Sequence, residues 1–317
     1  MIIPLKWSES IMSKVAVWHQ PIMCCVLALG LSMANMTTIY AKPDLRPLGA
    51  NIAEQGSAYY QFKTQKFQSA DQQRNYQVWL GIPKNHKKNQ QSAAIFMLDG
   101  NSVMSRLNDT VLKKLSEWDA PVLVAIGYQS NLPFESAARS VDYTPADETG
   151  KIMPDPRNPE RMTGGSVQFC ELIIHQIQPW VRQQVALDPQ RTALWGHSYG
   201  GLFVLDTLLN TKDQPFSHYF SASPSLSWAD ARILNAVAKT DAAQLQHKKL
   251  VVMEGDHVQS QARFSINADR EMIQNNRQLV QDLAHKGVDA KLILYPHLSH
   301  GQVFQAALMD VLNNQLF

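Results

Sequence analysis

Residues 191–210, RTALWGHSYGGLFVLDTLLN, decide the fold because they predict a strand, a sharp turn and a helix in immediate succession. An apolar run at 192–195 precedes the turn, and large apolar side chains recur at helical spacing after it. The turn at 196–200, GHSYG, has the G-x-S-x-G pattern of a nucleophile elbow, in which a strained turn raises a serine above a sheet. Ser198 is therefore the predicted nucleophile.

Continuous apolar runs around this segment are typical of parallel strands that are covered on both faces. Strands are expected at 94–98, 121–127, 219–221, 250–253 and 291–295, and helices at 102–115, 166–186 and 302–315 and before Gly287. Alternating apolar and polar residues at 59–67 and 76–82 predict an antiparallel hairpin at the sheet edge. We therefore expect one α/β domain at 42–317, with a mainly parallel central sheet and helices on both faces.

The one long irregular stretch, residues 128–165, contains five prolines, which resist helix formation. Loops of this length within a domain are commonly functional, so we expect an ordered loop over the mouth of the active site. Arg139 is the cation expected nearest the substrate. Lys151, Arg157 and Arg161 add positive charge, which acidic neighbours partly offset, and this rim suits an acidic substrate.

Residues 1–41 have the features of a secretory signal or an N-terminal anchor. An apolar stretch at 21–34 follows Lys6 and Lys14, and small residues at its end offer cleavage points. The stretch is shorter than the roughly 20 residues of a membrane span, but an uncleaved copy would tether the protein to the inner membrane. We therefore expect a periplasmic protein. Cleavage would leave Cys170 as the only thiol, so no intramolecular disulfide is expected.

The charge balance argues against a nucleic-acid partner, because 29 Lys and Arg residues are matched by 27 Asp and Glu residues. The patterns HExxH, CxxC, Walker A and GxGxxG are absent from the sequence, so neither a metal site nor a nucleotide cofactor is expected. The chemistry must therefore come from side chains and backbone groups.

The predicted nucleophile needs a base, because a serine hydroxyl is a weak nucleophile at neutral pH. His300 is the preferred base, since it lies in YPHLSHGQ, between the last predicted strand and the last predicted helix. His297 in the same segment is its rival. His197 is expected to point away from the hydroxyl of Ser198.

An acid that orients the base would come between serine and histidine along the chain, as in other α/β-hydrolases. The run at 250–253 is followed by two carboxylates, and we prefer Asp256 to Glu254 because it lies just past the predicted strand. A Ser/His dyad with no acid remains open.

The oxyanion that forms on the substrate needs backbone N–H donors, one of which is worth about 3 kcal/mol. The N–H of Tyr199 follows the nucleophile and is the first candidate. Gly100 or Asn101, after the strand at 94–98, would supply the second. Gly100 would also allow close approach of the substrate.

Seven segments of the chain resemble the periplasmic trilactone siderophore esterases, which hydrolyse enterobactin and its glucosylated form, salmochelin. They are FMLDGNSVMSRL, VAIGYQSNLPF, ARSVDYTPA, GGSVQF, ALWGHSYGGLFVLD, YFSASPSL and HLSHGQVF, so the resemblance covers most of the chain from Ala93 onward. It implies an α/β-hydrolase in which Ser198 and His300 match the family's serine and histidine. Arg139 matches an arginine positioned for the catecholate or seryl carboxylate end of the substrate. These esterases are associated with a Ser/His dyad, and the segment after Met253 departs from their pattern.

Together these observations predict an exported serine esterase without a cofactor, whose small-molecule partner is a catecholate siderophore or its ferric complex. Two alternatives stay open. One is a generic periplasmic carboxylesterase or acyltransferase, and the other is a non-catalytic siderophore-binding protein.

Overall fold

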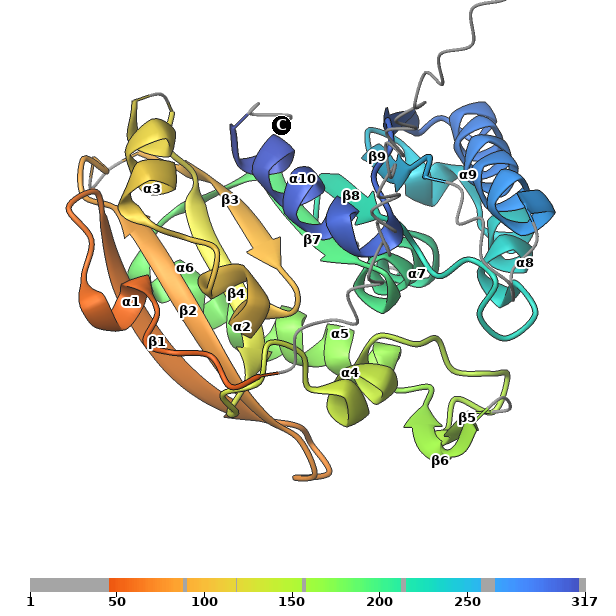
Figure 1. Cartoon of the computed structure of the whole chain (residues 1–317), viewed down its shortest axis with the longest axis horizontal. Helices are drawn as coiled ribbons and strands as arrows, with labels where there is room; N and C mark the ends of the chain where they lie inside the picture. Colours follow the sequence, from red (N-terminus) through yellow and green to blue (C-terminus); the bar gives the residue numbers. More distant parts are fainter. Residues whose placement is uncertain are drawn as a thin grey trace, which may run out of the picture. The chain divides into compact units, whose positions relative to one another are not determined.

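An eight-stranded sheet lies at the centre of the computed structural model (Figure 1). In spatial order its strands are β1 (Tyr60–Gln68), β2 (Asn75–Pro83), β4 (Val122–Tyr128), β3 (Ser92–Met97), β7 (Leu187–His197), β8 (His218–Ala222), β9 (Lys249–Gly255) and β10 (Asp289–Tyr295). Strand β2 runs antiparallel to both of its neighbours, and the strands from β4 to β10 pair in parallel. The predicted fold class, a mainly parallel α/β sheet with an antiparallel N-terminal edge, is confirmed.

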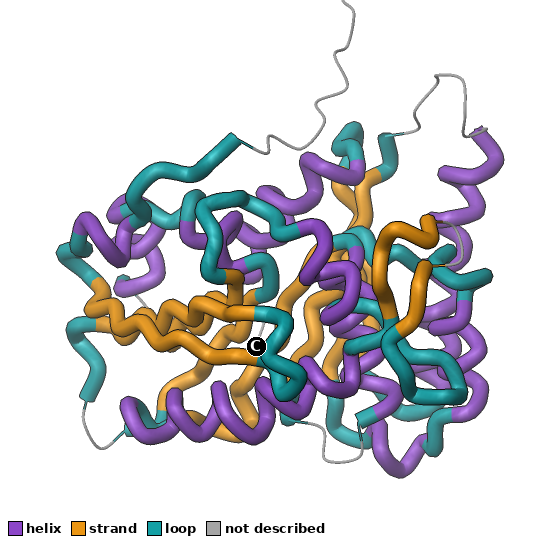
Figure 2. The backbone as a smooth tube through the Cα atoms, turned by 90° about the horizontal axis from the view of Figure 1, so that it is seen from below, coloured by secondary structure: helices purple, strands orange, loops and turns teal. Residues whose placement is uncertain are grey.

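Two apolar clusters separate the sheet from helices on its two faces (Figures 1 and 2). One face carries α5 (Ser166–Leu172), α6 (Gln178–Gln184), α7 (Tyr199–Asn210), α8 (Arg232–Lys239) and α9 (Ile266–His285), with a short 3₁₀ helix at Ala242–Leu245. The other carries α1 (Ile52–Gln55), α2 (Gly100–Met104), α3 (Asp109–Ser116) and α10 (His300–Asn313). Because side chains alternate between the faces of a strand, Val252 joins the first cluster and Met253 the second.

Two predicted helices are interrupted. The helix expected at 102–115 is divided into α2 and α3, because the Asn108 side chain accepts a hydrogen bond from the Val111 N–H and starts a new helix. The helix expected at 166–186 contains a π-helical turn, Ile173–Ile177, between α5 and α6. Pro179, at the start of α6, has no N–H to donate to the preceding turn, which accounts for the wider turn just before it.

The stretch at 128–165 is more regular than predicted. It contains α4 (Ser136–Asp142), which lies between two of its prolines, and a separate two-stranded sheet of β5 (Met153–Asp155) and β6 (Asn158–Thr163). The prolines therefore limit α4 to two turns instead of excluding a helix. Helix α4 carries Arg139 to the end of β7, as described below.

The structure describes residues 46–87, 90–117, 119–155, 158–211, 215–257 and 266–313, with the backbone alone at 266–270. The described elements all belong to one compact unit, Pro43–Phe317. The signal or anchor predicted at 1–41 and the predicted rim residue Arg157 lie outside the described residues. Within the described ranges, no helix is long and apolar enough to cross a membrane.

Candidate active site

The elbow is a strained turn between β7 and α7. Ser198 has φ 61° and ψ −117°, a backbone conformation that costs a non-glycine residue of order 1–3 kcal/mol. Its N–H donates to the carbonyl of Ala222 at 2.9 Å, which ties the turn to the neighbouring strand β8. A Cβ on Gly196 would overlap the carbonyl of Gly200, so the turn closes only with glycine at this position.

His300 lies against Ser198. Its Nε2 is 3.1 Å from Oγ of Ser198, a hydrogen-bonding distance for a serine and a base. His300 is the first residue of α10, not a residue before it as predicted, because the helix begins two residues earlier than expected. Ser299 caps this helix, and its own N–H and hydroxyl donate to Oε1 of Gln302 at 2.9 Å each. This is one half of an S-x-x-Q capping box, and it holds the backbone that carries His300.

The surroundings of His300 keep it in its basic form. The protein packed around the ring weakens its hydration, although the residue itself is exposed, and this effect and then the positive charge of Arg139 lower the pKa of His300 from its usual value. Among the described residues, the ring of His300 has Ser198 as its hydrogen-bond partner, lies against the ring of His197 and feels the charge of Arg139, and none of these is a carboxylate. A neutral imidazole is the form that accepts a serine proton.

The side chain of His197 contacts the backbone at His300. As predicted, it does not contact Oγ of Ser198; its buried Nε2 lies 2.7 Å from the backbone oxygen of His300. Its ring also contacts the ring of His300, with centroids 4.8 Å apart. Burial and then the neighbouring His300 lower the pKa of His197 well below its usual value.

Asp256 is not brought to His300. Its Oδ1 accepts a hydrogen bond from the backbone N–H of His297 at 2.6 Å, and its own N–H donates to Tyr295. Asp256 therefore stabilises the start of the turn that leads to His300. His297 has φ 62°, and its exposed side chain is part of the same turn.

Glu254 belongs to the opposite side of the sheet. Its fully buried carboxylate accepts from the hydroxyl of Ser223 at 2.6 Å, the N–H of Gly255 at 3.0 Å and the side-chain amide of Asn276 at 3.0 Å. Asn276 lies on α9, whereas His300 lies on α10, which covers the other face. Neither predicted acid lies in position to bind the ring of His300.

The predicted oxyanion donors lie at the starts of two neighbouring helices. Tyr199 is the first residue of α7 and Gly100 the first of α2, where helix N–H groups have no acceptor within their own helix. A Cβ on Gly200 would lie 3.5 Å from Leu98, so the end of β3 and the first turn of α7 are in contact. The two amides are therefore available at one edge of the sheet.

The side chain of Asn101 has a structural role. Its amide donates to the carbonyls of Tyr128 and Ser130, and its oxygen accepts from the N–H of Tyr128, so it pins α2 to the end of β4. The space beside Gly100 is filled by the backbone of β4, because a Cβ there would come within 2.7 Å of the nitrogen of Gly127. The close approach at Gly100 is thus to β4, not to a substrate as expected.

Arg139 does lie beside the elbow, but it is already paired. Its Nε and one terminal nitrogen each donate to an oxygen of Asp99 at 2.9 Å, and the same terminal nitrogen lies 3.4 Å from the carbonyl of His197. The Arg139 side chain is only 14% exposed. Such a two-pronged pair holds the guanidinium in one orientation.

Two contacts of the site escaped sequence reasoning. Asp99, a left-handed residue at the end of β3, was not singled out, although its place in the DGN segment marks a strand end. Ser225 lies with its Oγ 3.4 Å from that of Ser198 and donates its N–H to the Ser198 carbonyl at 3.2 Å. It follows β8 in YFSASPSL, and only the parallel pairing of β7 with β8 would have indicated it.

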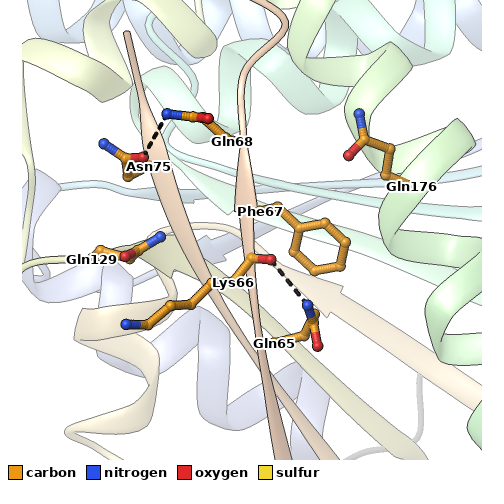
Figure 3. Close-up of a pocket in the computed structure, with 7 residues that line it drawn as sticks. All are labelled: Gln65, Lys66, Phe67, Gln68, Asn75, Gln129 and Gln176. Atoms are coloured by element: carbon orange, nitrogen blue, oxygen red, sulfur yellow. Dashed lines mark hydrogen bonds between the residues drawn. The ribbon is translucent and has the colours of Figure 1, made fainter. Parts of the chain in front are cut away.

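The predicted basic rim is less concentrated than expected. Lys151 and Arg161 lie on or beside the β5–β6 hairpin, and no contact joins either to Ser198 within the described residues. A hollow of about 500 Å³ lies at the β1 edge and is lined mostly by polar side chains, including Gln65, Lys66 and Gln129 (Figure 3). This hollow does not include the elbow. Within the described ranges, no cluster of three His, Cys, Asp or Glu side chains is arranged to hold a metal ion.

The chain is similar to known proteins over most of its length. A family model described as "Putative esterase" matches residues 69–314. Apo-salmochelin esterase of Escherichia coli O6:H1 (strain CFT073) is 41% identical over 285 residues, which are 89% of this chain and 88% of that protein. Siderophore enterobactin esterase of Emericella nidulans is 30% identical over 240 residues, 68% of this chain and 79% of that one.

Solved structures show the same fold. Enterobactin hydrolase IroE in complex with DFP is 39% identical, with a TM-score of 0.71 over 83% of this chain and 98% of that chain. Siderophore hydrolase EstA from Aspergillus nidulans, at 23% identity, has a TM-score of 0.64 over 81% of this chain and 95% of that one. The fold is that of an α/β-hydrolase.

Proposed function

Because the chain belongs to this esterase family, and so is a carboxylic ester hydrolase, we propose that Ser198 and His300 carry out the reaction through an acyl-enzyme. The observation that carries the proposal is the distance of 3.1 Å between Nε2 of His300 and Oγ of Ser198. The strained elbow supports it, since strain of this kind persists where the surrounding structure holds a functional side chain in place.

In the first half of the reaction, Oγ of Ser198 attacks the ester carbonyl while Nε2 of His300 takes the hydroxyl proton. The tetrahedral intermediate collapses, and His300 returns this proton to the leaving alkoxide, which departs as an alcohol. In the second half, His300 takes a proton from water, whose oxygen attacks the acyl carbon. Ser198 recovers its proton, and the acid product leaves.

The oxyanion of each tetrahedral intermediate is bound by backbone donors in this proposal. The Tyr199 N–H is the first donor, and an N–H of Gly100 or Asn101 is the second. The contact between β3 and the first turn of α7 supports this pairing. Asn101 would contribute through its backbone, because its side chain is held by β4.

The proposed substrate is a catecholate trilactone siderophore, cleaved at its ester bonds. This choice rests on the 41% identity to an apo-salmochelin esterase over 89% of the chain. Arg139 is the proposed contact for an anionic group. Since Asp99 takes Nε and one terminal nitrogen, a substrate would meet the other terminal nitrogen, for which the described residues provide no acceptor.

Export to the periplasm is part of the proposal, and residues 21–34 after Lys6 and Lys14 support it. Fractionation of cells that express the full chain tests it. A protein released with the periplasmic contents supports cleavage, one that sediments with the inner membrane supports a tether, and one found only in the cytoplasm contradicts export.

The activity is tested by incubating the purified protein with a trilactone, with and without ferric ion, and separating the products by chromatography. Linear and monomeric hydrolysis products are expected. If the trilactone stays intact while a simple acyl ester is cleaved, the substrate is wrong and the generic carboxylesterase is favoured. Transfer of the acyl group to an added alcohol in preference to water would favour the acyltransferase.

A further inference from the structure

His197 makes a contact that the proposed reaction does not use. The residue lies directly before the nucleophile, and its side chain is 6% exposed. Its Nε2 is 2.7 Å from the backbone oxygen of His300, and a carbonyl oxygen can only accept a hydrogen bond. The proton must therefore lie on Nε2 of His197, which donates it to the first residue of α10.

The ring of His197 has no free space to turn. It meets the ring of His300 with centroids 4.8 Å apart and the ring of Phe304 with centroids 5.4 Å apart in a T-shaped contact. Both partners lie on the first two turns of α10. The His197 side chain therefore contacts the backbone of His300, one face of the His300 ring and the ring of Phe304.

The usual supports of a catalytic histidine are engaged elsewhere. Asp256 accepts from the N–H of His297, and Glu254 is buried towards α9. In a Ser-His-Asp triad the acid keeps the imidazole in the right orientation for the serine. Here the same requirement must be met by groups that hold the backbone at His300.

We infer that His197 is a positioning residue that holds His300 against Ser198 through the main chain of α10. It donates from Nε2 to the carbonyl of His300 and so keeps Nε2 of His300 on Oγ of Ser198. No proton is exchanged with His197 during turnover. The inference rests on the proposed function, because it concerns the same base.

Three variants test this role. His197→Phe keeps a ring of similar size but removes the donor, and His197→Gln restores a donor without the ring. His297→Asn is the matched control, because it changes the exposed histidine of the same turn to a residue that tolerates positive φ. Each is compared with the unchanged protein and with His300→Ala.

The first readout is the rate at which a fluorophosphonate inactivates the protein, since this measures attack by Ser198 without siderophore binding. We expect His197→Phe to be inactivated about 100-fold more slowly, the typical cost of moving a catalytic group by 1 Å. For a trilactone, kcat should fall by a similar factor with KM unchanged. His197→Gln should recover most of both rates, and His297→Asn should match the unchanged protein.

Several results would overturn the inference. It fails if His197→Phe is inactivated at the unchanged rate, or if both variants lose rate and melting temperature together with no rescue by glutamine. Should the variants not fold, NMR of the unchanged protein labelled with ¹⁵N-histidine still decides once the signal of His197 is distinguished from that of the other buried histidine, His218, by comparison with His218→Gln. A His197 ring that carries its proton on Nε2 from pH 5 to pH 8 supports the role, and a proton on Nδ1 contradicts it.

The controls separate this inference from the proposed function. If the unchanged protein reacts and His300→Ala does not, the Ser198–His300 chemistry stands whatever His197 does. If neither the probe nor the trilactone reacts with the unchanged protein, the proposed function itself fails.

Discussion

The elbow and the histidine turn, residues 296–302, meet at Ser198 and His300 but are held in place differently. The elbow is held by contacts between backbone groups. Gly196 lies against Gly200, and the neighbouring strand β8 accepts the N–H of Ser198. The histidine turn has a local contact, from the Ser299 N–H and hydroxyl to Gln302 Oε1, and is otherwise fixed by groups from distant segments. These are the Asp256 carboxylate on the N–H of His297, the His197 side chain on the His300 carbonyl, and Gly255, which leaves room for the Leu298 carbonyl.

This difference shows that the nucleophile depends on local sterics, whereas the base depends on contacts across the fold. Substitutions in the elbow should therefore act on the whole site at once. Substitutions around the histidine turn should act in smaller, separable steps.

The largest effect is expected from removing the nucleophile itself. Ser198→Ala should lower kcat by about 10⁶-fold, as loss of the serine does in Ser-His-Asp proteases, while the siderophore still binds. Ser225→Ala, which removes the neighbouring hydroxyl, should cost less than about tenfold, the size of one lost hydrogen bond. Steady-state hydrolysis and ligand binding measure both. If Ser198→Ala retained turnover, Ser198 would not be the nucleophile.

A pair of glycine variants then compares the two turns directly. Gly196→Ala should lower the free energy of unfolding by about 1–3 kcal/mol, because its Cβ overlaps the Gly200 carbonyl. Its kcat should fall about 100-fold as Ser198 moves. A Cβ on Gly301, in the histidine turn, would meet open space. Gly301→Ala should therefore leave kcat unchanged, and the free energy of unfolding should stay the same or rise by up to about 1 kcal/mol. Urea unfolding and kcat measure the pair, and equal effects would contradict the difference between the turns.

The pH profile tests the electrostatic part of the histidine turn. Activity requires neutral His300, so its lowered pKa places the acid limb of kcat/KM below the usual histidine range. Arg139→Gln removes a positive charge and leaves Asp99 unpaired. Both changes favour protonated His300, so the acid limb should move to higher pH. Arg139→Lys retains the charge and should move it less, and a shift to lower pH would show that Arg139 does not act on His300.

The smallest effect is expected from Asp256, whose carboxylate accepts the N–H of His297 in the histidine turn. Asp256→Asn keeps an oxygen that can accept from the His297 N–H, so kcat should change by less than tenfold, on the scale of one modified hydrogen bond. A loss of about 10⁴-fold would instead assign Asp256 the role of a triad acid. Steady-state kinetics at the plateau of the pH profile distinguish these outcomes.

The sequence was most informative where structure is determined locally. The strands around Ser198 have continuous apolar runs, and the glycines of the elbow mark a turn that only they permit. The break at Asn108 was also readable, since an asparagine before an acidic residue is a common helix start. The capping box from Ser299 to Gln302, which moves the start of α10 to His300, was a further local signal.

The residues that hold His300 in place could not be predicted from the sequence, because they depend on which segments the sheet order brings together. Asp256 and Glu254 lie two residues apart in the sequence, yet one side chain holds the histidine turn and the other is buried towards α9. The pairing of Arg139 with Asp99, 40 residues away, likewise depends on where α4 packs. Periodicity identifies a helix such as α4 only when its apolar face is long, and α4 is seven residues long.

Helix α10 also has a consequence for the synthesis of the protein. Ser198 and His300 are 102 residues apart. At about 5–20 residues per second, the ribosome adds the base roughly 5–20 s after the nucleophile. In the proposed mechanism, a chain on which α10 has not docked carries Ser198 without its base and does not cleave esters. The onset of ester hydrolysis would therefore report, in real time, that the last described helix has packed onto the sheet.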